Sequence, residues 1–422
     1  MSTQAGQVQP GRNKAIVASL LGNTLEWFDL SVFAYFSLTI SHVFFPMESQ
    51  YMALILTLST FAISFLIRPI GAIVLGDYAD VHGRKSALSL SIFLMFLGTL
   101  MIAVMPGYAS LGMVSPIGIL VARLIQGFSA GGEFGSATAL MMEQAPLGSR
   151  TFVASLQFSS QGLGIVLASA FGYALTSRLN EQQMADWGWR VPFLFGLLIG
   201  PVGLYLRRTL DDSLDVARPR NDLGPVREIF ASQKMLVIVA MGSLIVSTAS
   251  NFMLKYVPSY VTTTFHIPQS SGFLATLTAG LLLVFITPVV GYLANDACRI
   301  RLMLAAVCVY LISIFPAFIW LEHYPSSASL LTVVGLMALV NAIYVAPLAS
   351  VMADVFPART RATGVSLSYN LGVTIFGGFA PMIAAGLISL TGSPLAPAYY
   401  LVFASMLSIL SLLEARSRRG LN

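Results

Sequence analysis

The chain has 422 residues, of which 56% are hydrophobic and 10% are charged, and its mean hydropathy is +0.79. Because a typical soluble domain carries about 25% charged residues, this composition excludes an ordinary soluble protein and indicates an integral membrane protein. The net charge of +5 is typical of cytoplasmic anchoring residues, so we expect no nucleic-acid partner. The two cysteines, Cys298 and Cys308, have no metal or redox spacing.

Apolar runs of about 20 residues, bounded by charges or by Pro and Gly, predict membrane-spanning helices. Twelve such helices are expected, at 15–45, 52–76, 86–106, 111–142, 151–179, 187–207, 234–264, 269–294, 301–321, 326–354, 361–390 and 394–414. A charged stretch separates them into an N-terminal bundle (1–206) and a C-terminal bundle (235–422), joined by a cytoplasmic linker (207–234). The predicted fold is therefore an all-α membrane protein with two six-helix bundles.

Lysine and arginine concentrate in cytoplasmic loops. With the N-terminus inside, 18 of the 23 Lys and Arg residues fall on the cytoplasmic side of the predicted helices. This regular alternation supports an even number of spans with both termini in the cytoplasm.

The first span carries two carboxylates, Glu26 and Asp29, within an otherwise apolar stretch. Residues three apart lie on one face of a helix. Asp29 is about 14 residues in from the cytoplasmic side, or roughly 21 Å, and thus reaches the depth of a central cavity. We expect Asp29 to exchange a proton and Glu26 to form an ion pair, with Arg68 of the second span as a candidate partner.

The fourth span carries Arg123 and Glu133, and a charge near the bilayer centre costs at least about 2.5 kcal/mol, so both should face a cavity or a partner. They are about 15 Å apart along the helix, too far for direct pairing. The planar guanidinium of Arg123 suits a carboxylate ligand; a structural ion pair with Asp29 is the alternative. Burial favours the neutral form of a carboxyl group, so Glu133 joins Glu26 and Asp29 as a candidate proton site.

Small residues recur on the same span, at Gly127, Gly131 and Gly135. This spacing lets a neighbouring helix approach closely, so these glycines are expected to pack without chemistry of their own.

An internal repeat relates the two halves. The pattern acidic-x-x-Pro-x-x-x-Arg occurs from Glu143 to Arg150 and again from Asp354 to Arg361. Each copy follows the fourth span of its half, so the bundles are predicted to be pseudo-symmetric parallel repeats. The loop GDYADVHGRK (76–85) has a degenerate counterpart, GYLANDACRIR (291–301), in the second half.

The loop after the second span, with its pattern Gly-x-x-x-Asp-x-x-Gly-Arg-Lys, resembles the signature of the major facilitator superfamily. Further stretches resemble its metabolite:proton symporter family, and within that family the citrate, tricarballylate and 2-oxoglutarate carriers: GNTLEWFDL, FLIRPIGAIVLGDYADVHGRK, RLIQGFSAGGEFGSA, WGWRVPFLFG and FPARTRATGVSLSYNLGVTIFGG. The resemblance implies two six-helix bundles around a central cavity and proton-coupled uptake of a small organic acid or a zwitterion by alternating access.

Charges at the cytoplasmic helix ends are either topology-setting or part of a gate, and the resemblance favours the gate. The candidate gating residues are Asp77, Asp80, Gly83, Arg84, Lys85, Glu143, Arg150, Asp354 and Arg361. We expect them to tune the conformational equilibrium without touching substrate.

In the second half, Lys255 of the seventh span is a second candidate for binding an anion, although it lies close enough to the outer end to reach the membrane surface instead. Polar uncharged residues are weaker candidates for the cavity wall, because hydrogen bonding between helices explains them equally well. They are Gln157, Gln161, Asn251, Tyr369 and Asn370.

Together these features predict a proton symporter for a di- or tricarboxylate such as citrate, without a cofactor or metal site. A symporter of betaine or proline, a proton-coupled exporter, a membrane enzyme and a sensor are the alternatives. The fifth span lacks the Gly-Pro pair frequent in exporters, and no Gly-x-Ser-x-Gly or phosphate-binding motif indicates an enzyme. The expected partners are the organic anion, the proton and membrane lipid, and the protein is expected to be a monomer in the inner membrane.

Overall fold

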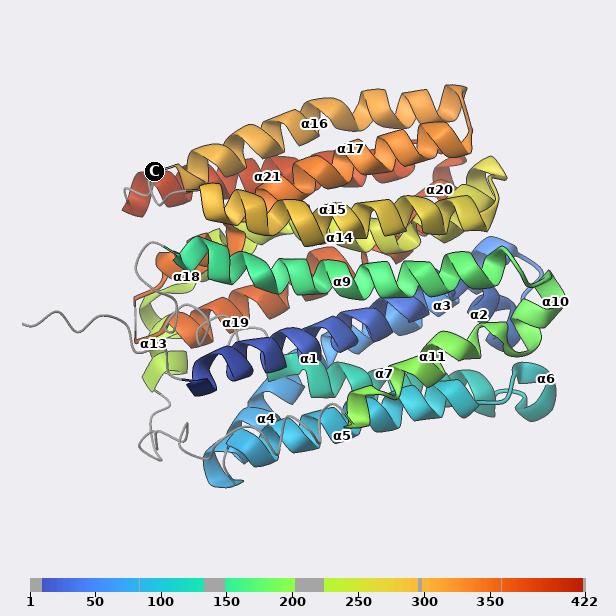
Figure 1. The fold of residues 1–422 in the computed structure, drawn as a ribbon, viewed down its shortest axis with the longest axis horizontal. Coiled ribbons are helices and arrows are strands. Elements are labelled where there is room, and N and C mark those ends of the chain that lie inside the picture. The colour runs from blue at the N-terminus through green and yellow to red at the C-terminus, as the bar shows by residue number, and fades with distance from the viewer. Residues whose placement is uncertain are drawn as a thin grey trace, which may run out of the picture.

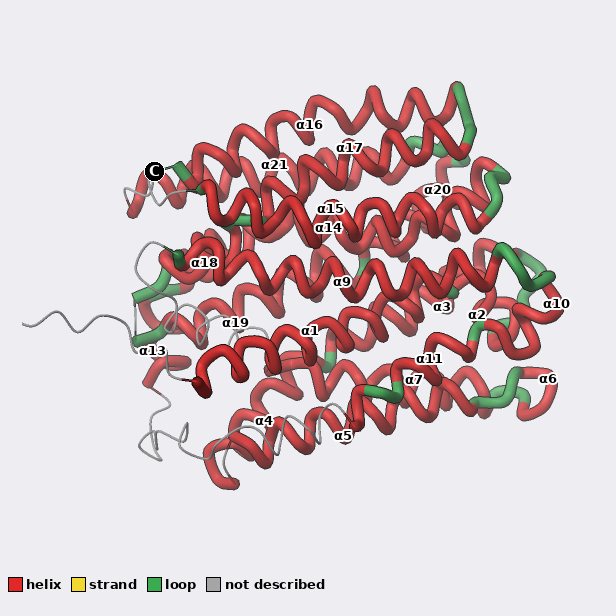
Figure 2. The backbone as a smooth tube through the Cα atoms, in the orientation of Figure 1, coloured by secondary structure: helices red, strands yellow, loops and turns green. Residues whose placement is uncertain are grey.

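The computed structural model describes residues 10–82, 84–132, 149–201, 224–294, 298–357 and 359–419, and every regular element in these ranges is a helix (Figures 1 and 2). A helix satisfies its backbone hydrogen bonds internally, as the interior of a bilayer requires. The predicted all-α fold is therefore confirmed.

The first half contains a series of helices in chain order. They are α1 (Pro10–Tyr35), α2 (Ser37–Phe44), α3 (Gln50–Leu66), α4 (Arg68–His82), α5 (Arg84–Val104), α6 (Tyr108–Leu111), α7 (Val114–Ser129), the 3-10 turn η1 (Ala130–Gly132), α9 (Arg150–Thr176), α10 (Glu181–Gln183), the π-helical η2 (Met184–Gly188) and α11 (Arg190–Gly196).

The second half follows the same plan. Its elements are α13 (Gly224–Ser232), α14 (Lys234–Phe265), α15 (Gln269–Leu293), α16 (Arg299–His323), α17 (Ser327–Val345), α18 (Leu348–Val355), α19 (Arg361–Gly372), the π-helical η4 (Val373–Gly378), α20 (Ala380–Thr391) and α21 (Ala396–Arg419).

Each predicted span contains a helix where the structure describes it. Among the described residues, eight helices are long and apolar enough to cross a membrane, and two shorter apolar helices cover 89–104 and 114–129. The fourth predicted span is described as far as Gly132 and the sixth as far as Pro201. Most of the predicted linker lies outside the described residues, but α13 occupies its last part.

The helices run roughly parallel to one another, and the two halves meet along several of them (Figure 1). α9 of the first half lies beside α15 of the second, and α3 lies against η4 and α20. Between these contacts, α1 packs on α14. The core of buried apolar side chains is continuous across this interface, so residues from both halves enclose one interior.

A proline break shapes the second predicted span. Pro69 has no N–H to donate to the carbonyl of Phe65, four residues earlier, and the helix is interrupted at Ile67, between α3 and α4. The hydroxyl of Thr374, from the second half, donates to the freed Phe65 carbonyl at 3.0 Å. The break thus gives a hydrogen bond between the halves and places Arg68 beside it.

The predicted close approach at the glycines of the fourth span is confirmed for two of them. A Cβ atom on Gly127 would overlap the carbonyl oxygen of Ser64, and one on Gly131 would overlap that of Arg68. α7 and η1 therefore touch the backbone of α3 and α4 directly. Gly135 lies outside the described residues.

Substitution of Gly127 by alanine should destabilise the protein by about 1–3 kcal/mol, because the backbone of α3 would have to move away. The matched control is Gly335 in α17, where an added Cβ meets no atom within 4 Å. Alanine favours a helix over glycine by roughly 0.5–1 kcal/mol, so Gly335→Ala should be neutral or stabilising. Thermal unfolding of the two purified variants measures the contrast, and equal melting temperatures would contradict it.

Candidate functional site

Five charged side chains lie in the interior where α1 and α14 meet, and they are called the charged cluster below: Glu26, Asp29, Arg68, Arg123 and Lys255. Each is at most 6% exposed. Bare charges are costly in a medium of low dielectric constant, so the arrangement of partners decides what the cluster can do.

Glu26 of α1 and Arg68 of α4 form the first ion pair. Arg68 Nη2 lies 3.4 Å from Glu26 Oε1, and the guanidinium covers the ring of Phe65 at 4.4 Å from its centroid. The predicted pairing of Glu26 with Arg68 is therefore confirmed. α1 supplies the carboxylate, and the break before Pro69 brings the arginine to the same depth.

Asp29 lies one helical turn further along α1 and is held by three side chains. Thr99 Oγ1 of α5 donates to Oδ1 at 2.8 Å, and Gln126 Nε2 of α7 donates to Oδ2 at 2.6 Å. Arg123 Nη1 lies 3.7 Å from Oδ2. Charge-assisted hydrogen bonds of this kind stabilise the ionised carboxylate, so a proton on Asp29 would weaken them all.

Arg123 of α7 is completely buried, and the described residues use only part of its hydrogen-bonding capacity. Its Nη1 donates to Gln126 Oε1 at 2.7 Å, while Nε and Nη2 have no hydrogen-bond partner among the described residues. The guanidinium stacks over Phe33 and Phe61, 4.4 and 5.2 Å from their centroids. The alternative role foreseen for Arg123, an ion pair with Asp29, is thus present, and two donor groups remain available for a further anion.

Lys255 of α14 is completely buried, so the alternative that it reaches the membrane surface is wrong. Its Nζ donates to the backbone carbonyl of Asn251 at 3.2 Å and lies 4.5 Å from the ring centroids of both Trp27 and Phe252. Within the described part of the chain no carboxylate pairs with Lys255. Aromatic faces attract a cation but leave its positive charge uncancelled.

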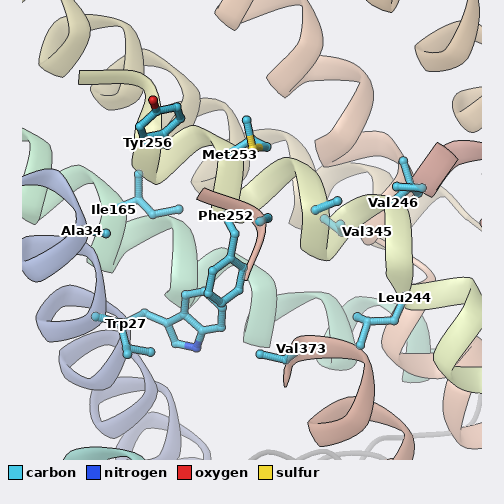
Figure 3. Packing of buried hydrophobic residues seen from close by; sticks show 14 of the residues in the cluster. Trp27, Ala34, Ile165, Leu244, Val246, Phe252, Met253, Tyr256, Val345 and Val373 are labelled. Carbon is cyan, nitrogen blue, oxygen red and sulfur yellow. The ribbon is translucent and has the colours of Figure 1, made fainter. Parts of the chain in front are cut away.

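Aromatic rings surround the charged cluster and join the two halves. Trp27 of α1 points towards Phe252 of α14 (Figure 3), with their centroids 6.0 Å apart. Phe61 and Phe65 of α3 also pack against Phe252, at 6.0 and 5.2 Å. These rings keep the cluster dry, which strengthens every electrostatic interaction inside it.

The predicted uncharged residues are all buried, but their surroundings differ. Gln157 and Gln161 lie on α9, and Tyr369 of α19 interacts with Gln161, Arg68 and Glu26 across the interface. Asn370 instead donates to the carbonyl of Gly131 at 2.9 Å and so links the halves. Asn251 lines a cavity inside the second half.

Hydrogen bonds between the halves lie on both sides of the charged cluster. Towards the end that carries α13, Asn370 bonds to Gly131 and Thr374 to Phe65. Towards the opposite end, the hydroxyls of Ser37 and Ser259 are 3.0 Å apart. Every residue of the charged cluster is buried between these two sets of hydrogen bonds.

The candidate gating residues are described in part. Arg299, in the degenerate second loop, forms an ion pair with Asp354 at 2.9 Å, and Arg361 Nε donates to the carbonyl of Ala353 at 3.0 Å. Arg150 begins α9. Gly83, Glu133 and Glu143 lie outside the described residues, and the side chains of Asp77, Asp80, Arg84 and Lys85 are likewise not described.

Sequence reasoning missed the two residues that hold Asp29, Thr99 and Gln126. Gln126 follows Arg123 by three positions, which places both on one helical face, so the spacing offered a signal. Thr99 lies on a different span, and no local sequence pattern indicates that it contacts Asp29. Among the described residues no group of His, Cys, Asp or Glu could hold a metal ion.

Two buried ion pairs of the first half lie beside a buried lysine of the second half, and comparison with known families shows the class of protein. The family model of the Major Facilitator Superfamily matches residues 27–381. The chain belongs to this superfamily.

Individual members of the superfamily match nearly the whole chain. The chain is 34% identical over 415 residues to a citrate-proton symporter of Klebsiella pneumoniae, covering 97% of this chain and 93% of the relative. It is also 34% identical over 414 residues to the alpha-ketoglutarate permease of Escherichia coli (strain K12), covering 96% and 94%. A putative proline/betaine transporter of Staphylococcus aureus (strain MSSA476) is 33% identical over 404 residues, covering 94% and 86%.

Solved structures share the fold. A crystal structure of a D-xylose-proton symporter superposes with a TM-score of 0.74 at 18% identity, covering 96% of this chain and 97% of that one. The predicted superfamily and its kinship with citrate and 2-oxoglutarate carriers are therefore confirmed.

The Glu26–Arg68 pair yields a prediction about stability. Glu26→Gln leaves Arg68 charged without its buried partner and should cost about 3–5 kcal/mol, whereas the double variant with Arg68→Met should recover much of this loss. The control is Arg359→Gln, since Arg359 pairs with Glu228 at 3.7 Å with 66% of its side chain exposed, and such surface pairs contribute about 0–1 kcal/mol. Thermal unfolding of the three variants measures these effects. A double variant no more stable than Glu26→Gln alone would contradict coupling between the two residues.

Proposed function

We propose that this protein imports a small di- or tricarboxylate together with protons by alternating access. The observation that carries the proposal is Lys255, a fully buried cation without a carboxylate partner in the described chain. With Glu26 and Asp29 ionised, the three cations of the charged cluster exceed its two carboxylates. An anion is the ligand that balances this excess.

The proton and the anion are linked through Arg123. When Asp29 takes up a proton, Arg123 loses the negative charge that lies 3.7 Å away. Its Nε and Nη2 groups, which have no hydrogen-bond partner in the described part of the chain, are then free to hold a substrate carboxylate together with Lys255. Release of the proton restores the Asp29–Arg123 pair and expels the anion. The carboxylate that binds the proton thus controls the cation that binds substrate.

Two sites of positive charge suit two carboxylate groups of one molecule. Arg123 reaches the interior from α7 of the first half and Lys255 from α14 of the second. A di- or tricarboxylate can engage both and so draw the halves together, which couples binding to occlusion. A monocarboxylate can satisfy only one of them.

The zwitterion alternative fits these contacts less well. A quaternary ammonium group such as that of betaine is usually held against aromatic faces. Here the protein's own cations cover the rings of Trp27, Phe33, Phe65 and Phe252. A betaine cation would have to displace one of them into a dry interior, against charge repulsion.

Alternating access requires the hydrogen bonds on each side of the cluster to open in turn. Asn370 and Thr374 close one side, and Ser37 with Ser259 closes the other. On the side closed by Asn370 and Thr374, the Arg299–Asp354 pair and the hydrogen bond of Arg361 stabilise the second half. We place the protein in the inner membrane as a monomer, with both termini in the cytoplasm and the 207–234 segment linking the two bundles.

The function is tested by counterflow in proteoliposomes. Vesicles preloaded with unlabelled citrate or 2-oxoglutarate should accumulate the same labelled acid, and an inward proton gradient should drive net uptake. Betaine and proline are tested in parallel. Exchange of betaine or proline without any carboxylate exchange would overturn the assignment, as would a requirement for a sodium gradient in place of the proton gradient.

Asp29→Asn should separate exchange from proton coupling. The amide keeps the size of the side chain and one oxygen that accepts a hydrogen bond, but it cannot take up a proton, so a pH gradient should no longer drive accumulation, while counterflow persists. Asp186→Asn, an exposed site, is the control and should behave as wild type. If Asp29→Asn still concentrates substrate in response to a pH gradient, another carboxylate carries the proton.

Lys255→Met should weaken substrate binding. Loss of a charge-assisted hydrogen bond costs about 1.5–3 kcal/mol, or roughly ten- to a hundredfold in KM. Lys234→Met, at the exposed start of the same helix, is the matched control and should leave KM unchanged. Uptake kinetics for citrate measure both, and a wild-type KM for Lys255→Met would remove Lys255 from the site.

A further inference from the structure

A cavity lies inside the second half of the molecule, next to the charged cluster along α14. Its volume is about 80 Å³, and side chains of α14, α15, α16, α17 and α21 line it. Phe252, Lys255 and Ser259 of α14 contact the first half. Asn251, Leu254 and Val257 line the cavity. At 100° per residue the two sets lie on adjoining faces of α14, with Asn251 about 40° from Lys255.

The walls are apolar except for a few uncharged polar groups. Asn251 Oδ1 is buried and has no hydrogen-bond partner within the described ranges. Asn341 of α17, 5% exposed, also lines the cavity, and within the described chain its amide makes no hydrogen bond. The hydroxyls of Ser250 and Tyr310 pair at 2.7 Å on the same wall. Burying an unpaired amide is unfavourable, so a ligand that hydrogen-bonds to the two amides would be stabilised in the cavity.

The chemistry of the ligand follows from the lining. No acidic or basic side chain lines the cavity, so an ion would enter without a counter-charge. Leu283, Phe318 and Val333 offer apolar contacts, whereas the two amides offer an acceptor and a donor. We propose that this cavity is a binding site for a small neutral molecule that has an apolar body and one hydroxyl group, as small alcohols and phenols have.

A ligand in this cavity would affect the position of Lys255 in the charged cluster, because the ligand contacts α14, which carries Lys255. Lys255 donates to the backbone carbonyl of Asn251, whose side chain lines the cavity. Pro258, inside the same helix, leaves one backbone hydrogen bond unmade and is a natural bending point. A ligand packed against Asn251 therefore supports α14 one turn below Lys255.

The test compares 4-fluorophenol with 4-fluorotoluene, which differ in the hydroxyl group. Fluorine NMR on the purified full-length protein should show a saturable signal for 4-fluorophenol that unlabelled phenol displaces, with at least about tenfold weaker binding of 4-fluorotoluene. Equal binding of both probes, or no saturable signal for either, would overturn the proposal, because the cavity would then be merely apolar or filled with water.

Two variants locate the site. Ala338→Phe fills the cavity from α17 and should abolish binding of 4-fluorophenol, whereas Leu336→Phe, 58% exposed on the same helix, should not. Asn251→Leu removes the acceptor and should bring the affinity for 4-fluorophenol down to that for 4-fluorotoluene. Unchanged 4-fluorophenol binding in folded Ala338→Phe or Asn251→Leu would place the ligand elsewhere and refute the assignment.

Discussion

Charges in the dry interior of a membrane protein persist only where opposite charges, hydrogen bonds or aromatic faces compensate them. In this protein that constraint acts on α1, which brings Glu26 and Asp29 into the core one helical turn apart. Each carboxylate needs its own cation, and the two cations come from different helices, Arg68 of α4 and Arg123 of α7. The packing of α4 and α7 around α1 supplies each of the two carboxylates with a cation.

The two ion pairs are not equivalent. Arg68 contacts Glu26 at 3.4 Å and stacks on Phe65, beside the backbone break that bonds to the second half. Asp29 instead accepts hydrogen bonds from Thr99 and Gln126, and within the described chain its arginine has two donor groups without a partner, against one on Arg68. The first pair is suited to holding the structure together, and the second is suited to linking proton uptake to anion binding.

Lys255 adds a constraint that involves both halves. It belongs to α14 but rests on Trp27 of α1, so its surroundings depend on how the halves are docked. In the proposed function, a substrate that engages Lys255 and Arg123 together would stabilise the docked arrangement, while an empty and deprotonated site would rely on the aromatic contact. Lys255 would then take part both in recognition and in the conformational equilibrium.

The sequence by itself determined the membrane class, the helical fold and the one-turn spacing of Glu26 and Asp29, because hydropathy and helical rise are local properties. It also predicted the Glu26–Arg68 pair and left two roles open for Arg123. Only the tertiary structure decided that Thr99 and Gln126 hold Asp29, that Lys255 is buried against Trp27, and that Asn370 links the halves. Such contacts depend on the rotation and offset of helices distant in the chain, and no local pattern specifies these.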